Sequence, residues 1–484
     1  MSEFGLPGVR HVALPGRRRD PLMTPARLKL ARTIATTGVI LIVSRAIGLV
    51  REFLITLAFG FTKLTDLFFQ ATFVPNYLLN ILNGPFTTAL MASLNRAPAE
   101  ARAGHLRRYG LRSLRAALVV APLFLAGGAG VAAFVGGAHG ADILLTCALL
   151  APACAAVVVI GYVAAAANAC GMIARANALT TVINAIFVLG VLLIWVSGVR
   201  GQAWLLPVAF TAAALAAAAL AWRWLGEMLG EVGGDAAPSP VAASGRLPGL
   251  RRGFLLALGE SAAFIGTQLL VLALASHVAV GWASAATLAQ RIALSVVGLI
   301  AVPVTNLAIV AAMNSPQRAP RIFRSCALAL FLGSAVVAVA AHVLRAPVEA
   351  AVGGGWGDFD ARSAHLLMAL VPPFSLWLVA MVMNAPAARM LFGMGMGKLY
   401  TQVTLTGYAV ANVVRVVACL RHDFPLAIAL GAAIELVAAL ALCLVAYIVL
   451  ARRGDVSFRD NDALDRAGAP SPMSAAAAAR PEST

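Results

Sequence analysis

Charged and amide side chains recur inside long apolar stretches of this chain. The first stretch contains Arg45, Arg51 and Glu52, the second begins near Asp66, and a later one contains Arg291. An arginine at the centre of a bilayer costs about 2.5–3.5 kcal/mol on insertion scales, so in a membrane such groups face protein or water. The pattern predicts a charged site that is shielded from lipid.

Guanidinium groups in both halves of the chain indicate a site for an anion. Arginine binds phosphate or pyrophosphate through two parallel hydrogen bonds. The candidates for holding such a group are Arg45, Arg51 and Arg291. Arg45 and Arg291 are expected to face a seam between the two halves, while Arg51 lies near the end of its stretch and is also placed to reach the membrane surface.

Carboxylates in the same stretches are expected to pair with these arginines when the site is empty. Glu52, Asp66 and Glu260 are the predicted charge-pairing or gating residues, and Asp66 is the expected partner of Arg45 or Arg51. The alternative is that these ion pairs are purely structural and never open to a ligand.

Amide side chains follow Asp66 along the next helix. Gln70, Asn76, Asn80 and Asn83 are predicted to form one polar stripe, and Pro75 is expected to kink the helix. In lipid such a stripe must face protein or water. Asn76 and Asn80 are therefore included in the predicted substrate site.

Composition defines the environment of these residues. Of 484 residues, 61% are apolar and only 12% are charged, and the mean hydropathy is +0.87. A soluble domain is roughly a quarter charged. These values exclude a soluble enzyme, a nucleic-acid-binding protein and a disordered chain, and they predict an all-α polytopic membrane protein.

Twelve apolar runs are long enough to be membrane spans. They cover about 32–58, 64–93, 111–136, 142–168, 173–198, 203–224, 253–278, 281–312, 322–344, 364–390, 398–420 and 425–450. We expect two six-helix lobes, at 32–225 and 251–453, joined by a cytoplasmic linker at 226–250. We expect disordered tails at both ends of the chain, a basic one at 1–31 and a second one at 454–484.

The basic residues orient these spans. With both termini placed in the cytoplasm, 28 Lys and Arg residues fall on the cytoplasmic side and five on the opposite side. This asymmetry predicts an even number of spans with both ends inside. The net charge of +17 is thus explained by basic residues concentrated on the cytoplasmic side of the membrane, and it requires no nucleic-acid partner.

The two halves are weakly alike. The segment from Pro85 to Asn95 and the segment from Pro303 to Asn314 both precede basic loops, and Asn184 and Asn412 lie in similar settings. Such parallel repeats, with the substrate site between them, are common in transporters. Chance similarity between segments rich in Ala, Val and Leu is the alternative.

No catalytic, nucleotide-binding or metal-binding motif is present among those considered. The six cysteines lie in apolar stretches and form no C-x-x-C pair, so they are interpreted as small apolar filler. We expect no enzyme activity, no cofactor and no metal; Na⁺, H⁺ or the membrane potential remain possible energy sources. A membrane glycosyltransferase is disfavoured because the longest external loop, 345–363, offers few catalytic groups.

The first two spans resemble the MviN/MurJ family of lipid II flippases, in the multidrug/oligosaccharidyl-lipid/polysaccharide (MOP) exporter superfamily. The matching pattern is Ser44-Arg45-x-x-Gly48-x-x-Arg51-Glu52, then Phe59-Gly60, Thr65-Asp66-x-Phe68-Phe69-x-Ala71 and Pro75-Asn76. Weaker matches are Gly161 to Asn168, Asn184, Arg291, Arg389 and Asn412. This chain differs from the family in three ways. Leu79 and Asn80 stand where the family usually has an Arg pair, and Asn83-Gly84 stands where it has Glu-Gly. The family also has two further C-terminal helices beyond the twelve spans expected here.

The resemblance implies a V-shaped pair of six-helix lobes around a cationic cavity. It also implies that a polyprenyl-pyrophosphate glycan, lipid II or a similar precursor, is moved across a bacterial cytoplasmic membrane by alternating access. The expected partners are that lipid-linked glycan and membrane lipids, with the protein acting as a monomer. The alternatives are an exporter of capsule or exopolysaccharide repeat units and a cation-coupled multidrug antiporter.

The charge asymmetry generates a test of topology. Reporter fusions at Gly233 and Gly454 should give cytoplasmic signals, and a fusion at Gly355 should give an external signal. An external signal at Gly454 would contradict the even number of spans.

Overall fold

The computed structural model describes most of residues 43–452. Its description omits 45, 83–85, 96–98, 136–137, 171, 200–203, 234–249, 302–303, 306–307, 309–311, 313–317, 355–358, 395 and 422. Both predicted tails, and most of the predicted linker, lie outside the described residues.

Helices make up nearly all of the described chain. The first half contains a helix over 46–59, then α2 (Lys63–Ile81), α3 (Thr87–Asn95), α4 (Ala99–Val135), α5 (Ala138–Ala169), α6 (Ile173–Val196) and α7 (Leu205–Gly233). The second half contains α8 (Leu250–Val278), α9 (Trp282–Val296), the π-helix η2 (Val297–Ala301), α11 (Ala319–Val343), α12 (Arg345–Val352), α13 (Ala361–Gly393), α14 (Gly397–Cys419) and α15 (Phe424–Arg452).

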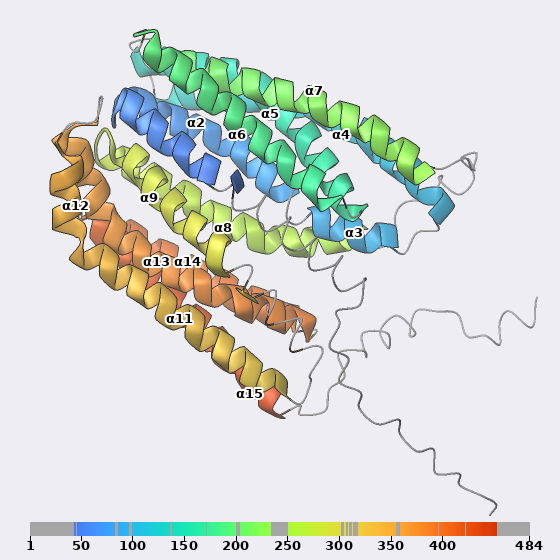
Figure 1. The fold of residues 1–484 in the computed structure, drawn as a ribbon. Coiled ribbons are helices and arrows are strands. Elements are labelled where there is room, and N and C mark those ends of the chain that lie inside the picture. Colours follow the sequence, from blue (N-terminus) through green and yellow to red (C-terminus); the bar gives the residue numbers. More distant parts are fainter. Residues whose placement is uncertain are drawn as a thin grey trace, which may run out of the picture.

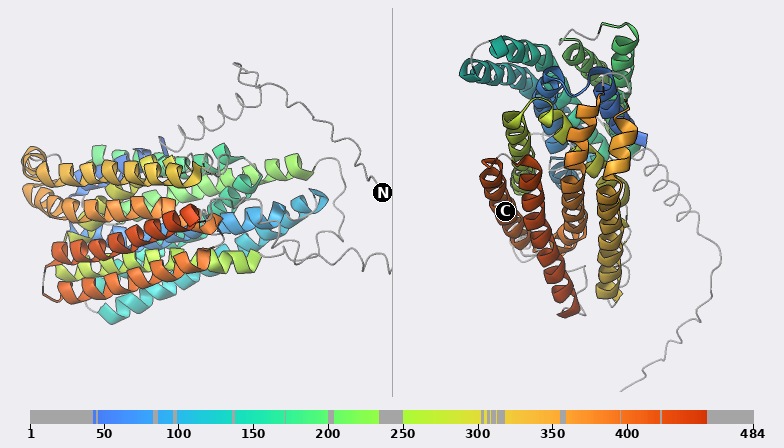
Figure 2. Two further views of the ribbon diagram at one scale, coloured as in Figure 1. Left: turned by 90° about the horizontal axis from the view of Figure 1, so that it is seen from below. Right: turned by 90° about the vertical axis from the view of Figure 1, so that its left-hand side faces the viewer.

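The predicted fold class is confirmed: the protein is an all-α polytopic chain folded into two lobes. Ten of the described helices are long and apolar enough to cross a membrane. The other two predicted spans fall on the helix over 46–59 and on α2 with α3. Helices α2 to α7 form one lobe and α8 to α15 the other (Figure 1), and the same division is visible from one end (Figure 2, right).

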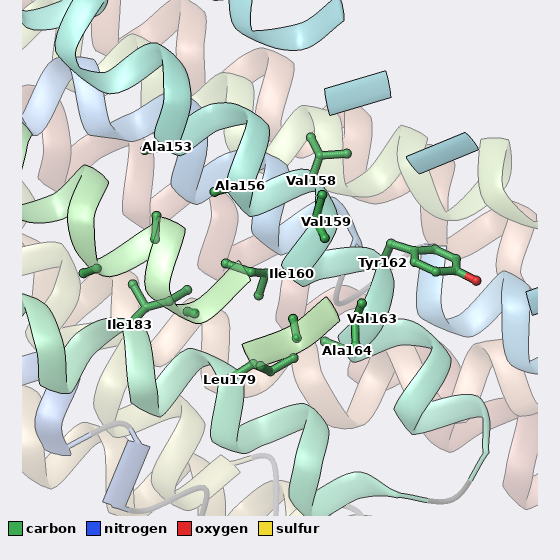
Figure 3. Close-up of a cluster of buried hydrophobic side chains, with 14 of the residues drawn as sticks. Ala153, Ala156, Val158, Val159, Ile160, Tyr162, Val163, Ala164, Leu179 and Ile183 are labelled. Carbon is green, nitrogen blue, oxygen red and sulfur yellow. The ribbon is translucent and has the colours of Figure 1, made fainter. Parts of the chain in front are cut away.

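Helix α5 is the centre of the first lobe, where it contacts α2, α3, α4, α6 and α7. Its sequence is almost entirely Ala, Val and other apolar residues, so neighbouring helices approach it from several sides. Ile160, Val163 and Ala164 of α5 lie in a buried cluster with Leu179 and Ile183 of α6 (Figure 3). The lobe is therefore packed around α5, whose second half is almost entirely buried.

Helix α13 has the corresponding position in the second lobe and contacts α9, α11, α14 and α15. It contains Pro372, Pro373 and Pro386, which remove backbone donors from the helix. Membrane helices tolerate such residues where neighbouring helices enclose the affected backbone. Residues on three of its turns, including Leu370, Trp377 and Leu391, are almost completely buried.

Three helical segments differ from the predicted boundaries. Helix α4 begins at Ala99, before the expected start of its span, because Leu106 is buried and its carbonyl accepts a hydrogen bond from the Tyr162 hydroxyl. Helix α7 continues to Gly233, into the predicted linker, and buries Leu225 and Met228 against the first lobe. The external loop predicted at 345–363 contains the short helix α12.

A buried ion pair joins α14 and α15 inside the second lobe. Arg415 Nη2 lies 2.7 Å from Glu435 Oε1, and both side chains are nearly inaccessible. Trp377 Nε1 donates to Glu435 Oε2 at 2.9 Å, and Arg415 Nη1 donates to Asn412 Oδ1 at 3.0 Å. Gly431 is adjacent, and a Cβ there would collide with the guanidinium of Arg415. The pair leaves no room for a ligand and is structural.

Separating this pair should destabilise the protein strongly. Arg415→Ala leaves Glu435 as an uncompensated buried charge, which should cost about 3–5 kcal/mol of unfolding free energy. The double variant Arg415→Met, Glu435→Leu should remain close to the original stability because it removes both charges. Thermal unfolding of the purified protein in detergent measures both. Equal destabilisation in the single and double variants would show that the two charges do not compensate each other.

Candidate functional site

A polar cavity of about 270 Å³ lies between the two lobes. Its walls come from the helix over 46–59, α2, α5, α6 and α9. The neutral polar residues of its lining are Ser44, Asn76, Asn80, Asn168, Asn177, Thr180, Asn184 and Ser295. Because Asn168 ends α5 and Asn177 is in the first turns of α6, the cavity lies toward the end of the molecule that carries the α5–α6 turn.

Three charged residues converge on the wall of this cavity. The Glu52 carboxylate pairs with the guanidinium of Arg51, its neighbour in the first lobe. The same oxygen, Glu52 Oε1, lies 3.7 Å from Nε of Arg291, which belongs to α9 in the second lobe. One buried carboxylate is thus shared by an arginine from each lobe.

The guanidinium of Arg51 is held from two further directions. Its Nη1 donates to Asn184 Oδ1 of α6 at 2.8 Å, and its Cζ lies 5.9 Å from the ring centroid of Phe187, one turn further along α6. Gly48 lies one turn before Arg51, and a Cβ there would come to 3.5 Å from Asn184 Nδ2. Helix α6 therefore positions Arg51 through an amide and an aromatic face.

Two atoms of this group have no hydrogen-bond partner within the described residues. They are Glu52 Oε2 and Arg51 Nε, both fully buried. A buried polar atom without a partner costs free energy, and a functional role or a bound water or ion is among the explanations for it. Arg415 Nε of the structural pair also lacks a partner within the described residues, so it is the adjoining cavity that gives the Glu52 group room for a ligand.

The amide residues of α6 were not singled out from the sequence, apart from Asn184. Asn177, Thr180 and Asn184 are spaced by three and four residues, so they lie on one face of the helix. All three line the cavity. This regular polar spacing inside a span with a mean hydropathy of 2.4 is the signal that identifies them.

The predicted stripe on α2 is divided between two faces. Asn76 and Asn80 line the polar cavity, as predicted for the substrate site. Gln70 instead faces an apolar groove on the other side of α2. Six residues separate Gln70 from Asn76, which places them on different sides of an α-helix, so grouping them in one stripe was wrong. Asn83 lies outside the described residues.

The remaining charged residues of the predicted site differ in where the structure places them. Arg51 does not reach toward the membrane surface; it is 8% exposed and points at the cavity. Arg45 and the side chain of Glu260 lie outside the described part of the chain. The predicted pairing of Asp66 with Arg51 is wrong, because the Asp66 carboxylate contacts the second lobe instead.

Asp66 caps the N-terminus of α9 across the lobe interface. Its Oδ2 accepts from the backbone N–H of Gly281 at 2.6 Å, and its Oδ1 accepts from the backbone N–H of Ser284 at 2.8 Å and from the Ser284 hydroxyl at 2.5 Å. A carboxylate is stabilised at this position by the unpaired N–H groups and the positive end of the helix dipole. Gly281 has φ 93°, a conformation that strongly favours glycine.

The same end of the molecule, where α12 lies (left in Figure 1), is closed by further contacts between the lobes. The backbone N–H of Phe61 donates to Ser363 Oγ at 3.3 Å, and the Phe61 and Phe359 rings meet edge to face with centroids 5.3 Å apart. Phe61 is buried in the hydrophobic core of the second lobe. The cavity is therefore sealed at one end by a polar latch, Asp66 on the α9 N-terminus, and by an aromatic contact.

No protein-family model matches this sequence, and no curated protein matches it. Solved structures do match the fold. An inward-facing multidrug resistance MATE family transporter of the MOP superfamily aligns with a TM-score of 0.65 at 13% identity, covering 88% of this chain and 96% of that one. Lipid II flippase MurJ in an inward closed conformation aligns with a TM-score of 0.65 at 13% identity, covering 87% and 90%.

A MOP superfamily transporter from Pyrococcus furiosus also aligns, with a TM-score of 0.60 at 13% identity over 87% of this chain and 96% of that one. The apolar helices and the two lobes with a cavity between them define a multi-pass membrane protein. More particularly, the chain has the fold of MOP superfamily transporters. At this level of identity the likeness establishes the fold.

The Asp66 latch generates a test of accessibility. A cysteine at Asn80, in a background whose six native cysteines are replaced by alanine, should react with a membrane-impermeant maleimide only from the side of the α5–α6 turn. Adding Asp66→Ala should allow labelling from the α12 side as well, because the latch between the lobes is lost.

Asp423→Ala is the matched control, since Asp423 accepts from the Leu426 backbone N–H at 2.9 Å and caps α15 within its own lobe. It should leave the labelling side unchanged. If Asp66→Ala behaves in the same way as Asp423→Ala, Asp66 stabilises a helix and does not close the cavity.

Proposed function

We propose that this protein is a flippase that moves a lipid-linked glycan carrying a pyrophosphate across a bacterial cytoplasmic membrane by alternating access. The observation that carries the proposal is the pairing of Arg51 and Arg291, one from each lobe, with the single carboxylate of Glu52 on the cavity wall. The resemblance of the first two spans to the MviN/MurJ family and the MOP fold support it.

The charge of the cavity favours an anion. Its described lining contains two arginines and one carboxylate, so these residues leave one net positive charge. A pyrophosphate offers oxygens that arginine binds in a planar, two-point arrangement. When it binds, it replaces Glu52 as the partner of one or both guanidiniums, and the ion pair between the lobes is exchanged for contacts with the substrate.

The neutral lining favours a glycan beside the anion. The four asparagines on α2 and α6, together with Thr180 and Ser295, offer both donors and acceptors to sugar hydroxyls without adding charge. An uncharged hydrogen-bonding wall next to a cationic patch matches a headgroup made of a sugar and a pyrophosphate.

The way in which α9 is held supports the proposal of alternating access. Its N-terminus is fixed to the first lobe by Asp66, and Arg291 further along is fixed to the same lobe by Glu52. Helix α9 then continues into the π-helix η2, a type of segment found frequently at functional sites. Releasing Arg291 from Glu52 removes one of these two attachments, which favours movement of one lobe against the other.

The orientation follows from the basic loops. The cavity lies toward the end of the molecule that the charge asymmetry places in the cytoplasm, and the latched end is the external one. This is the state in which a substrate enters from the inner leaflet. The protein acts as a monomer in this proposal, and Na⁺, H⁺ or the membrane potential supplies the energy.

A cation-coupled multidrug antiporter is the second candidate, because a MATE transporter aligns as well as the flippase does. The cavity charge disfavours it, since Glu52 is already paired with two arginines and no other carboxylate is found in the described lining. An exporter of capsule or exopolysaccharide repeat units uses the same headgroup chemistry, so the cavity does not distinguish it from a lipid II flippase.

Removing either cavity arginine should impair transport. In reconstituted vesicles, Arg51→Ala and Arg291→Ala should each lower the translocation of a fluorescent lipid-linked glycan by at least about tenfold, since a hydrogen bond to a charged group contributes about 1.5–3 kcal/mol. Arg291→Lys should restore only part of the activity, because an ammonium lacks the planar two-point geometry.

Arg223→Ala is the control, because Arg223 is a surface arginine whose side chain is 78% exposed. It should transport normally. Full translocation by the double variant Arg51→Ala, Arg291→Ala, at normal protein levels, would overturn the anionic-headgroup site and leave the arginines as structural residues.

A further inference from the structure

A second, apolar hollow opens at the seam between the lobes, on the other side of α2 from the polar cavity. Its volume is about 730 Å³, against about 270 Å³ for the polar cavity. The wall is formed by α2, α4 and α5 of the first lobe and by α8 of the second, and its lining carries no charged residue. The apolar residues of its surface include Leu67, Val74, Leu123, Val131 and Leu269. We call this hollow the lateral groove.

Helix α2 separates the lateral groove from the polar cavity. Asn76 faces the cavity, whereas Val74 and Leu78 face the groove. On the α8 side, Leu272 lines the groove and also a small pocket that contains Arg51, Glu52 and Arg291. The proposed headgroup site and the lateral groove are therefore one helix apart, and a single amphiphilic molecule is able to occupy both.

Two adjacent glycines shape the α4 wall of the groove. A Cβ at Gly128 would come within 2.6 Å of Cys147 Sγ, so this glycine allows α4 to pack closely on α5. A Cβ at Gly127 would meet no atom within 4 Å, because it would project into the open groove. The first glycine sets the packing of the wall and the second keeps its surface hollow.

The groove also lies toward the latched end of the molecule. Leu67 is one residue from Asp66, and Ser276 on α8 is close to the turn that Asp66 caps. The groove therefore occupies the half of the bundle opposite the mouth of the polar cavity. A chain in the groove lies in the other leaflet from a headgroup that enters through that mouth.

Resting on the flippase function proposed above, we propose that the lateral groove binds the polyprenyl chain of the transported lipid while its headgroup occupies the polar cavity. The groove is one helix away from the headgroup site, and Leu272 lines both the groove and the small pocket beside Arg51, Glu52 and Arg291. This proximity favours the substrate chain over a bulk phospholipid, whose headgroup must stay at the membrane surface. Since α8 forms one wall and α2 the other, movement of the lobes changes the width of the groove. Occupancy by the chain is thus coupled to the conformation of the transporter.

Photo-crosslinking tests this assignment directly. The full-length protein is reconstituted in phosphatidylcholine and phosphatidylglycerol vesicles with a polyprenyl pyrophosphate that carries a diazirine on its chain, and the labelled peptides are identified by mass spectrometry. We expect adducts on the groove faces of α2, α4 and α8, which excess unlabelled polyprenyl pyrophosphate removes. Labelling by a diazirine phosphatidylcholine that polyprenyl pyrophosphate does not displace, with no polyprenyl adducts in the groove, would overturn the proposal.

Gly127→Trp and Gly130→Trp form a matched pair of variants. A Cβ at either position meets no atom within 4 Å, but only Gly127 lines the groove. Gly127→Trp should fill the groove and lower polyprenyl crosslinking by about tenfold, because a few methylene groups lose their burial. Gly130→Trp should crosslink as the original protein does. Equal crosslinking by the two variants would overturn the groove as the chain site.

A headgroup probe separates this proposal from the proposed function. A water-soluble glycan pyrophosphate with a single isoprene unit should bind the original protein and Gly127→Trp equally, and should bind Arg291→Ala weakly. Headgroup binding without groove crosslinking overturns the chain site and leaves the flippase function standing. Loss of headgroup binding in the original protein overturns the flippase function itself.

Discussion

A charge inside a bilayer must have a partner, and in this protein one carboxylate supplies the partner for both lobes. Glu52 is paired with Arg51 in its own lobe and with Arg291 in the other. The desolvation of such a group is expensive, and breaking a buried pair without replacement costs several kcal/mol. The contact between the lobes at Glu52 is therefore one that another anion is suited to replace.

Two buried arginine–glutamate groups within the described residues show what distinguishes a structural pair from an exchangeable one. Arg415 and Glu435 are enclosed within one lobe, with Trp377 and Asn412 bound to them and Gly431 packed against the guanidinium. The Glu52 group lies instead between lobes, on the wall of a cavity lined by amides. The chemistry of the residues is the same, and the surrounding space decides their role.

The sequence predicted the elements well and the partners poorly. Long apolar runs and basic loops follow directly from the cost of burying polar groups in lipid, so the spans and two-lobe division were accessible from composition. Asp66 was assigned to Arg45 or Arg51 because opposite charges attract. The structure instead gives it the backbone N–H groups of Gly281 and Ser284 as partners, which no charge pattern reveals. Helical spacing alone could have predicted that Gln70 and Asn76 lie on different faces of α2. It could also have predicted the contribution of α6, through the regular positions of Asn177, Thr180 and Asn184. The extension of α4 to Ala99 could not have been predicted, since it depends on Tyr162 of another helix.

The double attachment of α9 gives this helix the geometry of a lever. Ten residues separate Gly281, held by Asp66, from Arg291, held by Glu52, which corresponds to about 15 Å along an α-helix. If the end at Gly281 serves as the pivot, a tilt of about 10° displaces the Arg291 end by roughly 2.5 Å. Arg291 Nε already lies 3.7 Å from Glu52 Oε1, so a displacement of this size away from Glu52 takes the two groups beyond ion-pair distance. A small angular change at the latched end of the molecule is thus converted into the making or breaking of a contact at its centre.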